Sequence, residues 1–401
     1  MFADTPTAPP DAIFGLAETF RDDPNPDKIN LGIGVYRNEQ GRTPVLRVVH
    51  QAEQSIWNTE STKSYLPIEG DRTYAEFVQL LLLGDNHPVL QESRITTAQT
   101  PGGTGALSVA ADFLKRLRPE ASAWVPEPTW ANHKNIFAAV DTPVATYPYL
   151  DSTGRRLAFE QLLEGLARVA PGDIVILHGC CHNPSGVDPD DEQWKAIGAL
   201  LAEREALPLV DLAYQGFGSG LLEDRRPVEI LCDQVPELVI CNSFSKNFSL
   251  YNERVGALTV VTTSAGAARA VLSQIRINIR VSYSNPPAHG ASIVSTILGD
   301  SDLRELWQQE LSEMRTRILA MRRLFVEELD ARGLALDQST NQVYLEHHGM
   351  FSFTGLEALQ IDELRKKHGI YMLGSSRINF AGLTSETVSP VCDAIASVVQ
   401  G

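Results

Sequence analysis

Long apolar runs and paired cysteines are both scarce in this sequence. No stretch stays apolar for the roughly 18 residues that a membrane-spanning helix needs, and the first residues lack the basic segment and apolar core of a secretory signal. The chain has 5 cysteines, of which Cys180 and Cys181 are adjacent, so at least one thiol is unpaired within the chain and a disulfide framework is a poor fit. These absences favour a reducing compartment, and we expect a cytoplasmic protein.

Positive charge is also in short supply. The 34 lysines and arginines stand against 50 aspartates and glutamates, which leaves a net charge of −16. The resulting field repels phosphate, so we expect no general attraction to nucleic acid or to an anionic membrane, and an anionic ligand needs a local basic pocket. One basic run does occur, at Arg315, Arg317, Arg322 and Arg323, with apolar residues between them at helical spacing. We expect these arginines to lie on the solvated face of a helix.

What the sequence does contain is an alternation of short β-rich runs and helical patterns. At 401 residues the chain is longer than one typical core of roughly 100 to 200 residues, and we expect two interwoven domains. Apolar runs separated by helical patterns occupy residues 94–99, 122–127, 173–179, 207–213 and 237–245. This alternation predicts an α/β fold with a mostly parallel sheet, whose functional sites gather at the carboxyl ends of the strands.

A long helical pattern divides the chain near its last quarter. It extends from Leu303 to Ala331 and leads to a C-terminal part with two further strand-like pieces. No Gly/Ser-rich linker separates the parts, so the two domains should pack tightly, with at most a hinge between them. We assign residues 1–45 to an N-terminal arm and part of a small domain, 46–309 to a large domain, and 310–401 to the remainder of the small domain.

Lys246 is the first candidate for chemistry. An apolar strand delivers Ser243, Ser245 and Lys246 into a polar turn, and Arg254 follows shortly after. A lysine that forms a Schiff base must be neutral for part of the time, and desolvation and nearby cations both promote the neutral amine. Arg254 has the geometry to hold a phosphate in a bidentate grip. Considered alone, however, this segment favours a surface lysine that follows a strand.

Asp211 and Tyr214 follow another apolar strand. A carboxylate there suits a protonated pyridine nitrogen, because that pairing keeps the ring able to accept electrons. The Tyr214 hydroxyl suits the phenolic oxygen of such a cofactor. A helix N-cap and a core tyrosine are the structural alternatives for these two residues.

Asn183 and Trp130 supply further groups that suit a cofactor ring. The amide of Asn183 can donate to a ring oxygen, and the indole of Trp130 offers a face for stacking, with core packing as the alternative for the indole. The cysteines and histidines before Asn183 suggest a metal site. Successive strand side chains point to opposite faces, so we do not expect Cys180 and Cys181 to share one ion, and we predict no metal.

Gly103 and Thr104 follow a strand and open a helix, where backbone N–H groups can bind a phosphate. The same segment supports a competing interpretation, a nicotinamide enzyme, because Gly103 and Gly105 together with Glu127 resemble a dinucleotide fingerprint. The third glycine position of that fingerprint is occupied by Ser108. The segment therefore predicts a phosphate site more firmly than it predicts a particular cofactor.

Together, these segments resemble the class I pyridoxal-phosphate aminotransferases of the aspartate and aromatic amino acid subgroup. The likeness covers nearly the whole chain, in the motifs "DKINLGIGVYRNEQGRTPVL", "YLPIEG", "TPGGTGAL", "HGCCHNP", "LAYQGFG", "SFSKNFSLYNERVG", "YSNPPAHGAS" and "GMFSFTGL". It implies the PLP-dependent transferase fold type I, with a mostly parallel seven-stranded sheet in the large domain and a smaller α/β domain. It also implies a homodimer with shared active sites.

The resemblance implies roles for individual residues. Lys246 holds pyridoxal 5′-phosphate as a Schiff base and moves the proton. The cofactor ring is contacted by Asp211, Tyr214, Asn183 and Trp130, and its phosphate by Gly103, Thr104, Ser243, Ser245, Arg254 and, across the subunit interface, Tyr65. The substrate lies beside Gly34, Asn183 and Trp130, with its α-carboxylate on Arg377 and a side-chain carboxylate on Arg280 across the interface. Ser376 precedes Arg377 where glycine is common in the family.

The implied reaction moves the amino group of L-aspartate to 2-oxoglutarate, giving oxaloacetate and L-glutamate by a ping-pong mechanism. A nearby positive charge and small polar groups favour a compact dicarboxylate, and Val35, Arg37, Thr43, Thr104 and Asn285 look like those of aspartate-selective members. Two alternatives stay open. One is an aminotransferase for aromatic amino acids, or for both classes, and the other is a non-catalytic module that binds pyridoxal phosphate.

Overall fold

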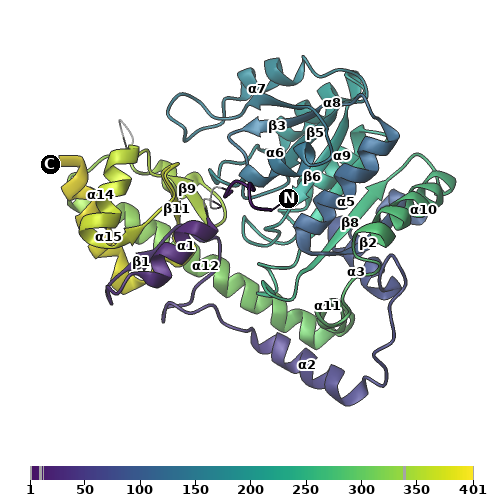
Figure 1. Cartoon of the computed structure of the whole chain (residues 1–401), viewed down its shortest axis with the longest axis horizontal. Coiled ribbons are helices and arrows are strands. Elements are labelled where there is room, and N and C mark those ends of the chain that lie inside the picture. Colours follow the sequence, from purple (N-terminus) through teal and green to yellow (C-terminus); the bar gives the residue numbers. More distant parts are fainter. Residues whose placement is uncertain (1, 9–10, 12, 337–339, 401) are drawn as a thin grey trace.

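A sheet of seven strands forms the centre of the molecule (Figure 1). The computed structural model describes residues 2–8, 11, 13–336 and 340–400. Strand β8 is antiparallel to both of its neighbours, and the other pairs are parallel. The expected mostly parallel seven-stranded sheet is therefore confirmed. Across the sheet the order is β2 (Ile95–Pro101), β8 (Val255–Val261), β7 (Leu238–Ser243), β6 (Leu207–Leu212), β5 (Ile174–His178), β3 (Ala123–Glu127) and β4 (Val144–Pro148).

Both faces of this sheet are buried, which explains the near-continuous apolar character of its strands. Successive residues of a strand point to opposite faces, so Ile176 packs in one apolar cluster and Leu177 in the other. The cluster of Ile176 includes α5 (Gly102–Leu117), and that of Leu177 includes α8 (Asp191–Glu203). A sheet packed on both faces in this way holds the residues at its strand ends in fixed positions.

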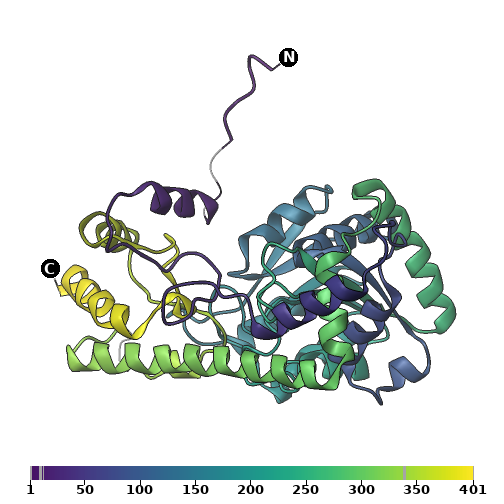
Figure 2. The same ribbon diagram turned by 90° about the horizontal axis from the view of Figure 1, so that it is seen from below.

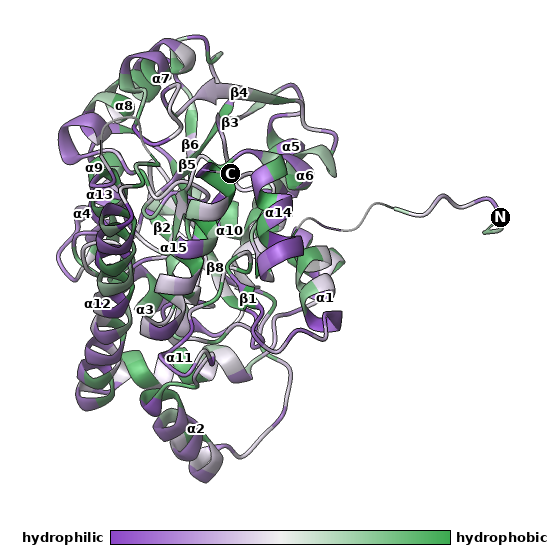
Figure 3. Ribbon diagram, turned by 90° about the vertical axis from the view of Figure 1, so that its left-hand side faces the viewer, coloured by the Kyte–Doolittle hydropathy of each residue, from purple (hydrophilic) through white to green (hydrophobic). Residues whose placement is uncertain are grey.

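Further helices surround the sheet, and none of the described helices is both long enough and apolar enough to cross a membrane. Residues 2–8 extend away from the rest of the molecule (Figures 2 and 3). The remaining helices before residue 300 are α1 (Phe14–Asp22), α2 (Arg47–Thr59), α3 (Arg72–Leu83), α4 (Pro88–Gln91), α6 (Ala131–Ala138), α7 (Phe159–Leu166), α9 (Arg226–Gln234), α10 (Ala265–Ser282) and α11 (His289–Gly299).

Helix α12 (Ser301–Ala331) runs along one side of the molecule (Figure 2) and confirms the long helix expected there. The carboxylate of Asp300 accepts N–H groups of its first turn and so caps its start. Farther along, the buried carboxylate of Glu310 accepts the backbone N–H of Arg47 and that of the next residue. Because α2 begins at Arg47 without a side-chain cap of its own, Glu310 ties the start of α2 to α12.

The first and last segments of the chain build a second region together. Strand β1 (Ile29–Asn30) pairs in parallel with β10 (Ile370–Tyr371), and β9 (Phe351–Phe353) pairs antiparallel with β11 (Arg377–Asn379). Figure 1 shows α1 and β1 beside the C-terminal helices, away from the seven-stranded sheet. The helices of this part of the chain are α13 (Val343–Glu346), α14 (Ala358–His368) and α15 (Ser385–Gln400).

One expectation about α12 was wrong. Figure 3 colours most of this helix as hydrophilic, yet Arg322 is 0% exposed, whereas the adjacent Arg323 is exposed. The Arg322 guanidinium donates to three backbone carbonyls and one hydroxyl of the segment 344–352. That segment covers the helix at this point. Helical periodicity places arginines on one face, but it cannot reveal which part of the face another segment will cover.

Candidate active site

Polar side chains at the carboxyl ends of β6 and β7 surround a cavity of about 340 Å³. This edge is where a parallel sheet is expected to bind its ligand. The residues that line the cavity include all of the predicted site residues except Tyr65 and Arg280. They are Gly34, Gly103, Thr104, Trp130, Asn183, Asp211, Tyr214, Ser243, Ser245, Lys246, Arg254 and Arg377.

Lys246 lies in the turn that follows β7, with its Nζ 4.5 Å from the centre of the Tyr214 ring. Burial of the ammonium group lowers the pKa of Lys246 to about 8 against the opposing charge of Asp211, and the positive charges of Arg254 and Arg377 act in the same direction as burial. Burial also raises the pKa of the Tyr214 hydroxyl, which stays protonated. An amine with such a pKa is partly neutral at physiological pH and can therefore act as a nucleophile or a base.

A chain of hydrogen bonds holds Asp211. His133 Nε2 lies 3.0 Å from Asp211 Oδ2, and Thr129 Oγ1 lies 2.8 Å from His133 Nδ1 and 3.0 Å from His178 Nε2. Because a carboxylate only accepts, His133 donates from Nε2 and accepts at Nδ1 from Thr129, which accepts from His178. Burial alone would raise the pKa of Asp211, but the hydrogen bond from His133 and the positive charge of Lys246 act against burial, and the pKa is lowered. Asp211 is therefore ionised.

Sequence reasoning assigned no role to His133 or Thr129. The available signal was the spacing of His133 from Trp130, which places the two residues one helical turn apart at the start of α6. Nothing in the sequence pairs His133 with a carboxylate 78 positions away. The contact arises because α6 follows β3, whose carboxyl end lies at the same edge of the sheet as the carboxyl end of β6.

The start of α5 presents hydrogen-bond donors that suit an anion. The residue before the helix, Pro101, offers no side-chain cap, so the first backbone N–H groups are open to a ligand. The hydroxyls of Ser243 and Ser245 lie 3.1 Å apart beside it, and Arg254 donates to Ser245 at 3.2 Å. Gly102 has φ of +73°, and a Cβ there would lie 2.5 Å from Arg254 Nη2, so glycine lets the guanidinium approach the helix. This arrangement suits a phosphate.

Arg377, the first residue of β11, lines the cavity from the second region. Its Nη1 donates to Asn183 Oδ1 at 3.0 Å and its Nη2 to the carbonyl of Gly32 at 2.6 Å. The residue is 3% exposed, no acidic side chain among the described residues pairs with it, and Nε has no acceptor. Burial lowers the pKa of Arg377 to about 10. A buried cation with an open donor gains strongly from a carboxylate ligand, which brings both charge and acceptors.

Ser376 precedes this arginine in a left-handed conformation, with φ of +66°. Glycine adopts this conformation at the least cost. In this chain the serine hydroxyl accepts the N–H of Gly355 at 3.3 Å, and the serine carbonyl accepts the N–H of Thr354 at 2.9 Å. The serine is thus bonded into the turn that presents Arg377.

Residues 26–395 match the family described as aminotransferase class I and II. The chain belongs to this family. It is similar to the aspartate aminotransferase of Salmonella typhi, with 48% identity over 399 residues and 100% of each chain covered. It is 44% identical to an aromatic-amino-acid aminotransferase of Pseudomonas aeruginosa, covering 99% of this chain and 98% of the relative.

A solved structure leads to the same family. The aromatic-amino-acid aminotransferase of Burkholderia pseudomallei, covalently bound to pyridoxal phosphate, superposes with a TM-score of 0.96 at 43% identity, over 99% of both chains. The interpretation of this chain as an aminotransferase is therefore confirmed. The nicotinamide and non-catalytic alternatives are set aside.

Two predicted site residues of this aminotransferase lie outside the cavity. Tyr65 is 92% exposed in the loop between α2 and α3, and Arg280 is exposed in the last turn of α10, where it donates to Ser284 Oγ. The two segments are joined, since Asn285 Nδ2 donates to the carbonyl of Leu66 at 3.2 Å. Tyr65 and Arg280 are thus presented by neighbouring segments of one surface, and within a single chain neither lines the cavity.

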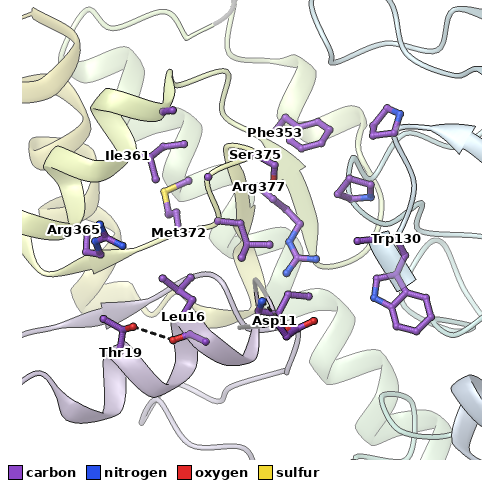
Figure 4. Close-up of a pocket in the computed structure, with 18 of the residues that line it drawn as sticks. Asp11, Leu16, Thr19, Trp130, Phe353, Ile361, Arg365, Met372, Ser375 and Arg377 are labelled. Carbon is purple, nitrogen blue, oxygen red and sulfur yellow. Dashed lines mark hydrogen bonds between the residues drawn. The ribbon is translucent and has the colours of Figure 1, made fainter. Parts of the chain in front are cut away.

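A second cavity, of about 930 Å³, adjoins the first in this aminotransferase. The two share Ile13, Trp130, Asn183 and Arg377. Figure 4 shows α1 along one wall of the larger cavity, with Trp130 across from it and the Arg377 guanidinium between them. Apolar side chains from beyond residue 350 complete the wall, namely Phe353, Ile361 and Met372. The larger cavity therefore adds partly apolar room next to Arg377.

Cys180, Cys181 and Asp224 each place one potential metal ligand within 4.8 Å of the others. The strand-alternation argument against such a trio was wrong here, because β5 ends at His178 and Cys181 has φ of +52°. Each oxygen of Asp224, however, already accepts two backbone N–H groups of the segment 216–220. A thiol–thiol hydrogen bond and burial raise the pKa of Cys180, and burial raises the pKa of Cys181 to about 12. We therefore assign no metal to this trio.

Proposed function

We propose that this enzyme transfers the amino group of L-aspartate to 2-oxoglutarate, giving oxaloacetate and L-glutamate by a ping-pong mechanism, with pyridoxal 5′-phosphate as its cofactor. The relative named aspartate aminotransferase, at 48% identity, supports this assignment. The observation that carries it is Arg377, a buried guanidinium with an unpaired Nε that shares one cavity with the amine of Lys246. An amino acid brings a carboxylate to the first and an amino group to the second.

The residues around the cavity fit pyridoxal phosphate. When bound, this cofactor supplies an aldehyde for Schiff-base formation and a pyridine ring that accepts electrons from the α-carbon of the substrate. The open start of α5 and the guanidinium of Arg254 suit its phosphate, the ionised Asp211 suits its ring nitrogen, and the partly neutral Lys246 suits its aldehyde. We assign the phosphate to Gly103, Thr104, Ser243, Ser245 and Arg254, and the ring to Asp211, Tyr214, Asn183 and Trp130.

Lys246 moves the proton in the proposed reaction. Once the incoming amino acid has displaced it, its amine would take the proton from the α-carbon and deliver it to the cofactor carbon that carried the Schiff base. The lowered pKa of Lys246 suits this work, because a base is most effective when its pKa lies near the working pH. Arg377 grips the α-carboxylate and so directs the α-hydrogen toward Lys246, while Gly34 and Trp130 border the substrate.

We propose a homodimer in which Tyr65 and Arg280 complete the active site of the partner. Tyr65 is 92% exposed, and exposed apolar side chains occur close to both residues in the sequence, with Trp57 83% and Val281 74% exposed. Such side chains on one surface are typical of an interface between subunits. In this arrangement Tyr65 contacts the cofactor phosphate across the interface, and Arg280 binds the side-chain carboxylate of aspartate.

Aromatic amino acids are the second candidate substrates. The cavity of about 930 Å³ adjoins the catalytic one and has apolar side chains in its wall. The relative of Pseudomonas aeruginosa, named for aromatic amino acids, is 44% identical. An aromatic ring fits such space when Arg280 turns aside, whereas aspartate uses the charge of Arg280. We rank aspartate first because Arg280, in its proposed position, favours a substrate with a second carboxylate.

We further propose that residues 46–309 form a large domain and residues 1–45 with 310–401 a small one. The pairing of β1 with β10, and the run of α12 from one region to the other, support these boundaries. We place the enzyme in the cytoplasm. All 5 cysteines are free and buried, and free thiols are typical of a reducing compartment.

Spectroscopy of the purified holoenzyme tests the proposed reaction. Aspartate, glutamate, phenylalanine and tyrosine are added one at a time, and the conversion from the Schiff-base absorbance to that of pyridoxamine phosphate is followed. We expect aspartate and glutamate to convert the enzyme fastest. Faster conversion by the aromatic amino acids would make them the main substrates, and no conversion by any of the four would refute the proposed function.

A further inference from the structure

Arg322, on α12, is a buried cation that the catalytic site described above leaves unexplained. It is 0% exposed, and none of the described acidic side chains forms an ion pair with it. Burial lowers the pKa of Arg322 to about 9. Burying a charge without a counter-ion is unfavourable unless hydrogen bonds compensate for the lost water. The acceptors that compensate here all belong to one segment, 344–352. Arg322 therefore holds this segment in place.

The two terminal nitrogens of Arg322 bind that segment at four points. Nη1 donates to the carbonyl of Tyr344 at 3.0 Å and to Ser352 Oγ at 2.7 Å. Nη2 donates to the carbonyls of Gly349 and Phe351 at 2.9 and 2.8 Å. A guanidinium fork can serve four acceptors in one plane, which a lysine ammonium with three donors on a single nitrogen cannot.

The segment has little room to shift on its other side. Gly349 has φ of +70°, and a Cβ at this position would lie 2.5 Å from the Cβ of Cys181. Cys181 belongs to the loop that carries Asn183, the acceptor of the Arg377 hydrogen bond. The segment is therefore clamped between α12 and the loop of Asn183.

Phe351 connects this clamp to the catalytic site. Its carbonyl is one of the acceptors of Arg322, while its ring lies under the Arg377 guanidinium at 4.1 Å from the centre. Phe351 begins β9, whose antiparallel partner β11 begins with Arg377. Arg322 also stacks on the ring of Phe380 at 4.3 Å, directly after β11. Arg322 thus contacts β9, whose Phe351 ring packs on Arg377, and also Phe380, the residue that follows β11.

We propose that Arg322 is a positioning residue for substrate binding, because it fixes β9 so that the Phe351 ring holds the Arg377 guanidinium ready for the substrate carboxylate. This inference rests on the proposed function, in which Arg377 binds the α-carboxylate. Both the amino acid and the 2-oxo acid present that carboxylate. Loss of the clamp therefore weakens both half-reactions through binding, and leaves the proton transfer at Lys246 nearly intact.

Steady-state kinetics of the holoenzyme with Arg322→Lys tests the proposal. We expect KM to rise on the order of tenfold for both substrates, the scale of a weakened desolvated cation–π contact, with kcat changed by less than about threefold. Retention of the cofactor should not change, since the proposed phosphate contacts lie on α5, β7 and the turn after it. Arg323→Lys, at the exposed neighbouring position, is the matched control and should behave as the wild type.

Phe351→Leu keeps the test decisive if Arg322→Lys does not fold. It removes the ring under Arg377 and leaves the backbone acceptor of Arg322, and the same rise in both KM values is expected. Unchanged KM values, a loss confined to kcat, or a parallel loss of cofactor would overturn the role of Arg322. A wild-type enzyme that no amino acid converts would instead overturn the proposed function, so the two failures are distinguishable.

Discussion

Lys246 and Arg377 are cations that line one cavity, but their surroundings differ. Lys246 lies at the strand ends of the large sheet, where Asp211 opposes the effect of burial and of two arginines on its pKa. Arg377 comes from β11 and lies among neutral oxygens and the ring of Phe351. An ammonium changes its protonation readily in such a place, whereas a guanidinium stays charged. We call the strand ends around Lys246 and Asp211 the first wall of the cavity, and β11 with Arg377 and the adjoining Phe351 the second wall. The first wall is therefore suited to moving protons and the second to binding anions.

The two walls also differ in how they are held. Backbone ladders between neighbouring strands fix the first wall, since β6 pairs with both β5 and β7. In the second wall, side chains from segments distant in the sequence hold the short strands and loops by hydrogen bonds. Arg322 does this for β9, and Asn379 does it for the backbone on both sides of Gly34. We expect substitutions in the first wall to stop the chemistry and substitutions in the second to weaken binding.

The largest effect is expected at the first wall. Lys246→Ala removes the amine that we propose moves the proton, and we expect kcat for transamination to fall by about 10⁴-fold or more. Stopped-flow or steady-state assays measure this loss, with the exposed Lys195→Ala as a control that keeps full activity. Near-normal turnover of Lys246→Ala would remove the distinction between the two walls.

At the second wall, Arg377→Leu removes the cation that we propose binds the substrate carboxylate. We expect kcat/KM to fall by about 10² to 10³-fold for the amino acid and for the 2-oxo acid, chiefly through KM. Saturation curves for both substrates check the result. A loss confined to one substrate, or one that appears in kcat with KM unchanged, would contradict a binding role for this wall.

Arg280→Leu sharpens the comparison by adding a residue proposed to act across the subunit interface. We expect aspartate turnover to fall by about 10²-fold, because a side-chain carboxylate loses its partner, while phenylalanine turnover changes only a few-fold. The ratio of kcat/KM for the two amino acids is the measurement. Equal losses for both would count against the assigned role of Arg280.

The smallest effect concerns the pH dependence of Lys246. Its pKa is lowered to about 8, so the amine is protonated below that pH and neutral above it. In the cofactor-free enzyme, the rate of reaction with pyridoxal phosphate should rise about tenfold per pH unit below about 8 and then level off. Stopped-flow absorbance measures this profile. A plateau reached only near the ordinary lysine pKa would show that the surroundings of Lys246 do not lower its pKa.

Predictability from the sequence differs between the walls as well. The five strands predicted from apolar runs are all present. Asp211 lies near the end of β6 and Lys246 in the turn after β7, and they meet because strand ends in a parallel sheet converge at one edge. Strands β4 and β8 were not read from the residues, and only the resemblance implied a sheet of seven. The hydrogen bond between His133 and Asp211 could not be predicted, because nothing in the sequence indicates that these two residues meet.

The sequence by itself determined the α/β class, the helix start to which we assign the phosphate, and the residues that meet at the strand ends. These features follow from local periodicity and from strand order. The tertiary structure alone decided the burial of Arg322, the bond between His133 and Asp211, and the stacking of Arg377 on Phe351. Each joins segments far apart in the chain, and side-chain pairing at such separations depends on packing that no local pattern encodes.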